Sequence, residues 1–281
     1  MSEINGRRHA YHAEASVLEG LLELPLQQKI HPQAYATLPE EGGYLSQRSE
    51  DFRLESVLSY RTAYTQVAGN HDVKPGHGWA TLTTSVVEGL NVLDVLTADR
   101  VVCQISTEHP LDGYVPTVSF LGSRFENLRI GGHLVEVDLD LNILGDRPAA
   151  DTAYTKEPGL IDRVTTQYRR IREARELPPD LGERYNRLSS SLGSPEAVEC
   201  SLVNRADGGY PGQCYGHMLT VPNFGRITLG KVTLHHDEFK TGTNIPKKTT
   251  VGLTMIHMKF GCAIAGSAGI AALSTNGMTR P

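Results

Sequence analysis

The chain has 281 residues, of which 39% are hydrophobic, 21% are charged and 6% are aromatic, and its 28 glycines and 15 prolines are typical of a turn-rich β protein. This composition excludes a disordered chain and a long coiled coil. The net charge is −5 and no Lys or Arg block exceeds two residues, so nucleic acid is not expected as a partner because no basic stripe can neutralise phosphates.

The N-terminal region contains arginines but no apolar run of signal-peptide length, and no stretch approaches the length of a membrane span. We therefore expect a cytoplasmic protein without a membrane span. The cysteines are too sparse for a disulfide scaffold, so we expect reduced, mostly buried thiols. They are Cys103, Cys200, Cys214 and Cys262.

The first half of the chain carries strand signals. The segment ASVLEGLLELPLQQKI is compatible with a helix or a strand, and Pro25 favours the strand. Residues 52–69 alternate large and polar side chains and predict one half-buried strand. Short β segments separated by turn residues follow, and without helical crossovers they favour an antiparallel sheet. These segments are GWATLTTSVVEGLNVLDVL, RVVCQIST, PTVSFLG, FENLRI and HLVEVDLDLNIL, of which the last is the clearest strand.

Residues 146–195 form a charged insertion with Pro-rich ends. Its middle predicts an amphipathic helix that ends before Pro178-Pro179, with one buried apolar face. That face consists of Ile161, Val164, Tyr168 and Ile171. Five arginines on this helix form either an anion-binding face or a solvated face with local Glu partners, and we expect the solvated face. They are Arg163, Arg169, Arg170, Arg172 and Arg175.

Strand signals return between residues 196 and 260, where Val251, Leu253 and Met255 alternate with small polar residues until Ile256 breaks the period. The segment after Gly261 is small and apolar. We expect it to contact other subunits by adding to a neighbour's sheet edge, with packing inside the same chain as the alternative.

One candidate for metal binding is Gly69-Asn70-His71-Asp72, which matches a short piece of the metallophosphoesterase pattern. The other loops of that pattern are missing, so we expect a turn between strands at this place.

The second candidate combines Cys214 and His217 with either His235 or His236. If the strands around these residues form a hairpin, a thiolate and two imidazoles could meet in a zinc site. His235 and His236 point to opposite faces of a strand, so only one of them can join, and a polar strand end without metal is the alternative.

No further catalytic motif is present. The chain lacks a G-x-S-x-G elbow, and Gly131-Gly132 and Gly208-Gly209 suit β-turns rather than a phosphate-binding loop. Asp94 and Asp99, or Glu108 and His109, could pair for acid–base work only if the fold brings them together. We therefore assign no catalytic, cofactor-binding or metal-binding residues and expect no cofactor.

A succession of short motifs resembles the bacterial surface β proteins called choice-of-anchor P, over about a third of the chain. The resemblance implies a non-catalytic extracellular β domain without an active site. This sequence differs from that pattern in lacking a signal peptide and an anchor and in containing an Arg-rich helix. The motifs are SVVEGLNVLDVLTADRV, FENLRIGG, NFGRITLGKVTL and GLTMIHMKFG.

Together these signals predict a mainly β fold: an antiparallel β-sandwich or closed barrel with one inserted amphipathic helix. We expect a single β domain built from residues 10–145 and 196–275, with two β domains as the alternative. The expected function is that of a non-catalytic structural or interaction protein that self-assembles into a homo-oligomer. The alternatives are a metal-dependent hydrolase using the Cys/His cluster and a small-ligand-binding β barrel.

Overall fold

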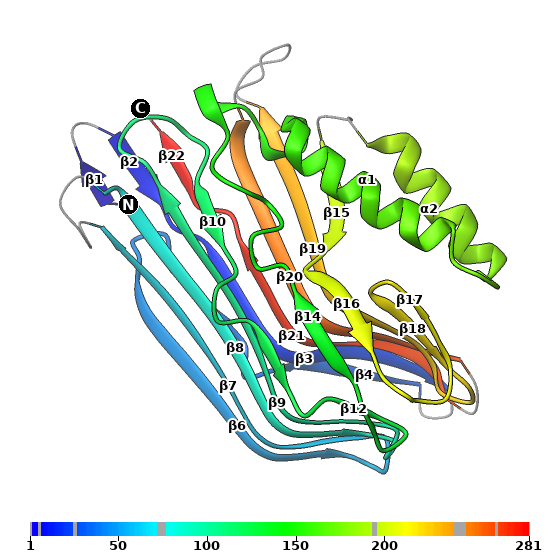
Figure 1. Ribbon diagram of the computed structural model, residues 1–281. Coiled ribbons are helices and arrows are strands. Elements are labelled where there is room, and N and C mark those ends of the chain that lie inside the picture. Colours follow the sequence, from blue (N-terminus) through cyan, green and yellow to red (C-terminus); the bar gives the residue numbers. More distant parts are fainter. Residues whose placement is uncertain are drawn as a thin grey trace.

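Two large antiparallel sheets form the body of the protein (Figure 1). The computed structural model describes residues 2–4, 7–24, 27–71, 77–192, 196–238, 246–261 and 264–280. The sheets pack face to face and the described strands do not close into a barrel, so the expected mainly β, sandwich-like fold is confirmed. Among the described residues, no helix is both long and apolar enough to cross a bilayer.

The first sheet has eight strands, in the order β13-β12-β9-β8-β7-β6, with β10 and β11 also paired to β9. Its strands are β6 (Gly43–Leu54), β7 (Leu58–His71), β8 (Trp79–Val92), β9 (Leu96–His109), β10 (Thr117–Ser119), β11 (Arg124–Glu126), β12 (Arg129–Ile130) and β13 (His133–Leu134). The single strand expected over residues 52–69 is wrong, because a turn with Glu55 at φ +48° divides it into β6 and β7. Gly131 and Gly132, at φ +56° and +81°, make the expected tight turn between β12 and β13.

The second sheet has nine strands, in the order β17-β18-β19-β20-β21-β3-β4, with β15 paired to β19 and β5 paired to β3. Its strands are β3 (Ala13–Leu24), β4 (Gln28–Gln33), β5 (Ala36–Thr37), β15 (Ala197–Ser201), β17 (Gln213–Tyr215), β18 (Met218–Val221), β19 (Gly225–Glu238), β20 (Pro246–Gly261) and β21 (Ala265–Thr275). The strand interpretation of the ambiguous N-terminal segment is confirmed by β3. This one sheet therefore combines strands from both ends of the sequence.

Two small sheets complete the strands. One joins β1 (Ser2–Ile4), β2 (Arg7–Ala10) and β22 (Met278–Arg280), and the other pairs β14 (Glu136–Leu139) with β16 (Val203–Asp207). The segment HLVEVDLDLNIL, expected as the clearest strand, is instead divided between β13, β14 and a turn. Its alternation is therefore not that of one continuous half-buried strand.

The insertion contains two α-helices rather than the one expected. The helical elements are the 3-10 turns η1 (Ala149–Asp151) and η2 (Tyr154–Lys156) and the helices α1 (Pro158–Arg172) and α2 (Pro179–Ser191). Pro179 does not end a helix. It occupies the first turn of α2, where its missing N–H needs no partner and its fixed φ suits the helix. Helix α1 contacts β15, and α2 packs against α1 (Figure 1).

The buried face of α1 agrees with the expectation at Val164, Tyr168 and Ile171, which are at most 1% exposed. The fourth buried position is Leu160, whereas Ile161 is only partly buried. The predicted face is therefore rotated by one residue at the start of the helix.

The arginines of α1 have different surroundings, although Arg163 and Arg170 line the same small hollow. Arg163 donates from Nε to the Ile143 carbonyl at 2.7 Å, and Arg170 donates to the Asn204 side chain at 3.4 Å. Arg169 and Arg172 are exposed. The expected solvated face with local Glu partners is therefore present only in part, because Arg163 and Arg170 contact residues of other segments.

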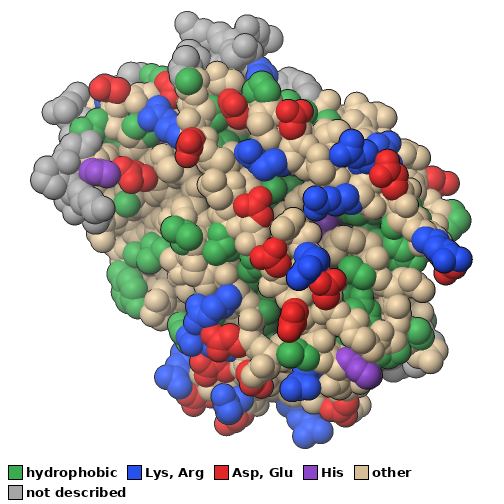
Figure 2. Space-filling view, viewed as in Figure 1, with side chains coloured by type: hydrophobic (Ala, Val, Ile, Leu, Met, Phe, Trp, Pro, Cys, Tyr) green, Lys and Arg blue, Asp and Glu red, His purple; other side chains and the backbone are tan. Residues whose placement is uncertain are grey.

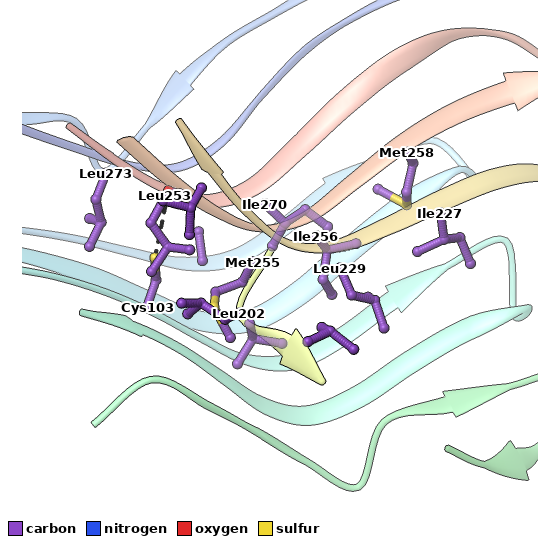
Figure 3. Packing of buried hydrophobic residues seen from close by; sticks show 14 of the residues in the cluster. Cys103, Leu202, Ile227, Leu229, Leu253, Met255, Ile256, Met258, Ile270 and Leu273 are labelled. Atoms are coloured by element: carbon purple, nitrogen blue, oxygen red, sulfur yellow. Dashed lines mark hydrogen bonds between the residues drawn. The ribbon is translucent and has the colours of Figure 1, made fainter. Parts of the chain in front are cut away.

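In both sheets, the alternation of buried and exposed side chains along the strands shifts by one residue at a bend. The shift occurs at positions that face one another across neighbouring strands. In β9, buried Leu96 and Ala98 are followed by buried Val101 and Cys103, so the alternation shifts by one residue at the bend. In the nine-stranded sheet the same shift makes both Met255 and Ile256 of β20 buried, which explains the break in the sequence period. Figure 3 shows Cys103, Met255 and Ile256 in the core. The neighbouring core side chains in that view include Leu253, Ile270 and Leu273.

The segment after Gly261 is an interior strand. β21 pairs with β20 on one side and with β3 on the other, and Ala268, Ile270, Ala271 and Leu273 are buried. The tail is therefore not available to add to a neighbour's sheet edge, and the alternative of packing within the chain is correct. Cys262 and Ala263 lie outside the described residues.

The substitution Val164→Asp should lower the free energy of unfolding by roughly 2–4 kcal/mol, because it places an unpaired carboxylate at a fully buried position. Urea denaturation followed by circular dichroism measures this change. The matched control Arg169→Ala should shift stability by less than about 0.5 kcal/mol. Equal losses in both variants would mean that the buried face of α1 is assigned incorrectly.

Deleting residues 262–281 should unfold the protein rather than leave an intact β domain, because the deletion removes the strand between β20 and β3. Circular dichroism and thermal melting of the truncated chain measure the result. A native spectrum with a cooperative melt would contradict the interior placement of β21.

Candidate functional site

Cys214 and His217 belong to a short hairpin at the edge of the nine-stranded sheet. Cys214 is an exposed residue of β17, and its Sγ lies 3.4 and 3.3 Å from the carbonyl oxygens of Ala206 and Gly216. His217 follows in the turn before β18 and is 4% exposed, with its Nε2 3.0 Å from the Tyr185 hydroxyl of α2. Burial lowers the pKa of His217 to about 4, so this imidazole is neutral near pH 7.

His235 lies far along β19 from His217. The Leu229 amide donates to the His217 carbonyl at 2.9 Å, and His235 follows Leu229 by six residues, or about 20 Å of extended strand. The hairpin ends do not meet because β18 is much shorter than β19. The hypothesis that Cys214 and His217 meet His235 or His236 does not hold in the structure.

The two later histidines have separate surroundings. His235 is exposed and its Nε2 lies 3.5 Å from Asp237 Oδ1, whereas buried His236 has its Nδ1 3.0 Å from the Thr155 hydroxyl of η2. In the part of the chain that the structure describes, no group of three or more His, Cys, Asp or Glu side chains is arranged to hold a metal ion.

The remaining polar candidates do not converge. Asn70 and His71 are the last residues of β7 rather than a turn, and Asp72 lies outside the described residues.

The carboxylates considered for acid–base work are held by separate neighbours. Asp94 Oδ1 accepts a hydrogen bond from Asn91 Nδ2 at 2.6 Å, and Asp99 Oδ2 accepts one from Asn127 Nδ2 at 2.6 Å. Glu108 pairs with His77 on the surface, while its neighbour His109 is buried.

A buried aromatic cluster joins the two ends of the described chain to the sandwich. The His9 ring of β2 stacks on Trp79 with centroids 5.2 Å apart, and it lies 4.6 Å from His109 and 4.7 Å from Tyr11. His9 Nδ1 is 2.9 Å from the Thr279 hydroxyl of β22. These contacts fix the small sheet of β1, β2 and β22 against the end of the larger sheets.

The cluster could not be predicted from local sequence patterns, because His9 is far from its partners along the chain. The turn after β8 gives one usable signal: folding the segment back on itself there places Trp79 opposite His109, as the β8–β9 register shows. No sequence signal placed His9 or Thr279 beside them.

This end of the interior is also unusually polar. Among the described residues, buried atoms without a hydrogen-bond partner include Trp79 Nε1 and the hydroxyls of Thr81, Thr83 and Thr107, all on β8 or β9. Each such atom costs about 1–3 kcal/mol relative to a satisfied one. Polar side chains without a partner among the described residues therefore gather at the end of the sandwich that the His9 cluster holds.

A long edge strand is the second notable feature. β6 has 12 residues and pairs only with β7 among the described strands, so one side of its backbone has no strand neighbour. Most of its side chains are exposed, including Tyr44 at 65% and Leu45 at 36%. Such an edge is a template for pairing with another chain.

The charges of β6 alternate in sign around Ser49. Arg48 and Glu50 form an ion pair of 2.6 Å on the exposed face, with side chains 65% and 58% exposed. Figure 2 shows that side chains of both signs gather at the lower end of the molecule in this view. Around Ser49 the edge is therefore polar and carries both charge signs.

A family model described as a domain of unknown function (DUF8256) matches residues 9–235. The chain belongs to the DUF8256 family. The matched range of this DUF8256 protein includes the whole eight-stranded sheet and both helices but ends within β19, before β20 and β21. No curated protein and no solved structure matches the chain.

Stability should fall as the pH drops from about 6.5 toward 4, because buried histidines must take up protons on unfolding. Burial, followed by the charge of His109, lowers the pKa of His9 to about 2, and burial lowers the pKa of His109 to about 4. Below their unfolded value of 6.5, each such histidine removes about 1.4 kcal/mol per pH unit. Urea denaturation between pH 7 and pH 5 measures the slope.

Substituting His109→Leu should make this slope shallower by about one proton, because it removes one buried histidine that takes up a proton on unfolding. The same slope in the wild type and in His109→Leu would show that His109 is not held neutral by burial.

Proposed function

We propose that this DUF8256 protein is a non-catalytic interaction protein that assembles with copies of itself, and that β6 is the edge through which it does so. The observation that supports the proposal is the 12-residue edge strand with one unpaired side among the described strands. The resemblance to choice-of-anchor P proteins favours the same kind of role.

The sequence of β6 suits a two-fold antiparallel pairing of two copies. If Ser49 lies on the two-fold axis, Arg48 faces Glu50 of the partner subunit on the same face of the continuous sheet, and the second pair repeats by symmetry. Opposite charges at directly facing positions stabilise an antiparallel pair, and like charges destabilise it. A second copy of this chain therefore complements the edge in both hydrogen bonding and charge.

Other routes to assembly are weaker. β21 has partners on both sides, and the free edge strands β4 and β17 of the other sheet have only six and three residues. Since main-chain pairing scales with strand length, β6 provides the larger hydrogen-bonded contact.

Light scattering after size-exclusion chromatography tests the assembly. The wild type should show a mass that rises with concentration toward twice 30.7 kDa. Arg48→Glu places like charges opposite each other twice per dimer and should weaken association at least about tenfold, which is ~1.4 kcal/mol. The double variant Arg48→Glu/Glu50→Arg restores opposite charges and should restore the dimer.

The control variant is Arg124→Glu, which breaks the comparable exposed pair of Arg124 with Glu126 on β11 and should leave the mass unchanged. A monomer at every concentration would overturn self-assembly. A dimer that is insensitive to Arg48→Glu would overturn β6 as its edge.

A further inference from the structure

A groove crosses the outer face of the nine-stranded sheet, on the side away from the core. It consists of two adjoining hollows of about 330 and 370 Å³ that share Glu19, Thr254, His257 and Ala272. The volumes lie in the range of small-molecule sites. The groove is distinct from β6, which belongs to the other sheet.

The groove exists because small residues face outward across several neighbouring strands. Gly252 and Ser274 are paired on β20 and β21, and Gly269 of β21 lies between Glu19 of β3 and His257 of β20. The missing side chain at Gly269 leaves a slot about 10 Å wide between the strands that carry Glu19 and His257. The side chains on the two flanking strands therefore become the walls of the groove.

Several polar groups that line the groove have no partner in the described part of the chain. Ser16 is 6% exposed and its hydroxyl makes no hydrogen bond, although the residue lines the hollow. Thr254, Glu19 and His257 likewise make no hydrogen bond or ion pair of their own. A hydroxyl at the floor and a carboxylate at the rim, both without a partner among the described residues, are groups that a bound molecule can satisfy.

The charge of the groove is close to balanced, because Glu14 and Glu19 offset Lys29 and Lys231 among the described lining residues. Lys231 is occupied by Glu199, at 2.9 Å between Nζ and Oε2, and Arg184 pairs with the same carboxylate. Burial, followed by the charges of Lys231 and Arg184, lowers the pKa of His257, which keeps its ring neutral near pH 7. Lys29, an exposed residue of the second hollow, is a lone cation and Glu19 lines the same hollow, so an anionic ligand meets no cluster of cations, whereas a neutral polar ligand needs none.

Both hollows of the groove add apolar surface to these polar groups. Leu21, Ile30 and Pro32 line the second hollow, and Tyr35, with 46% of its surface exposed, lines the first. Exposed rings and aliphatic side chains beside hydroxyl and carboxylate groups suit a molecule that has both hydroxyls and apolar C–H faces.

The outer face of the other sheet differs. There Arg48, Glu88, Arg100 and Tyr64 cover the strands with long side chains, and Arg100 reaches both Glu88 and the Tyr64 hydroxyl. A solvated sheet face is covered in this manner. The groove lacks this covering.

The geometry points to a binding site for a neutral, hydroxyl-rich ligand, a carbohydrate of about disaccharide size, in the groove formed by Ser16, Glu19, Thr254, His257 and Gly269. Glu19 accepts hydrogen bonds from ligand hydroxyls, Ser16 and Thr254 exchange hydrogen bonds at the floor, and the apolar surface contacts the ring faces. The inference does not depend on self-assembly through β6.

The test is a titration of the ¹⁵N-labelled full chain with maltose, cellobiose and lactose, followed by amide chemical shifts. At least one disaccharide should shift the amides of Gly252, Thr254 and Gly269 and leave those of β7 and β8 in place. Inorganic phosphate, as an anionic probe, should shift none of them.

Variants then locate the site. Gly269→Val fills the slot and is tolerated, because a Cβ at this position meets only Thr254 Cγ2 at 3.7 Å, an ordinary contact. It should abolish the shifts, and Glu19→Gln should weaken binding at least about tenfold. Glu23→Gln is the matched control, an exposed carboxylate on the same strand that does not line the groove.

Three results would overturn the inference: no disaccharide shifts these amides, phosphate alone shifts them, or the shifts persist in Gly269→Val. The mass measured by light scattering is a separate readout. A monomer that binds a disaccharide would reject β6 assembly and support the groove, and a dimer that binds none would do the reverse.

Discussion

The bend shared by the strands of each sheet is the constraint on which the rest of the structure depends. In the eight-stranded sheet, Asp51 of β6 and Gly89 of β8 have positive φ on the same row, and Gly230 and Ala271 do the same in the nine-stranded sheet. A single residue in this conformation resets which face the following side chains occupy. Because the strands of a sheet change together, each sheet keeps one continuous apolar face around the corner. For Ala271 this conformation costs on the order of 1–2 kcal/mol, which the packing around this fully buried residue must offset.

The bend also limits how accurately strand boundaries can be predicted from the sequence. Class and antiparallel pairing follow from strand composition and turn residues, and the α1 face follows from helical spacing. Continuous alternation, however, is a poor guide across a bend or a hairpin: residues 52–69 continue the pattern through the Glu55 turn, and HLVEVDLDLNIL alternates without being one strand. The second helix was missed because Pro178-Pro179 can end one helix and begin another. Contacts such as His9 with His109 carry no local signal at all, since they depend on the path of the whole chain.

The same limits apply to the sites. The Cys214 and His217 hypothesis assumed a symmetric hairpin, and the unequal lengths of β18 and β19 defeat it. The groove was not foreseen because Gly252, Gly269 and Ala272 have small side chains or none. They form a groove only when β20 and β21 pair and β3 lies beside them. β6 and the groove belong to different sheets, so an assembled sheet edge and an occupied groove are compatible in one molecule.

The placement of β21 has a consequence for how the chain reaches its native state. Its partner β3 precedes it by more than two hundred residues, and the nine-stranded sheet cannot join its two halves until residues 265–275 have left the ribosome. Until then, β3 and β20 each carry an unsatisfied edge, while the eight-stranded sheet can already pair through consecutive hairpins. Closing so long a loop late makes folding slow and leaves strand edges exposed during synthesis. The order of synthesis therefore leaves the edges of β3 and β20 exposed for longer than in a sheet whose strands are all neighbours in sequence.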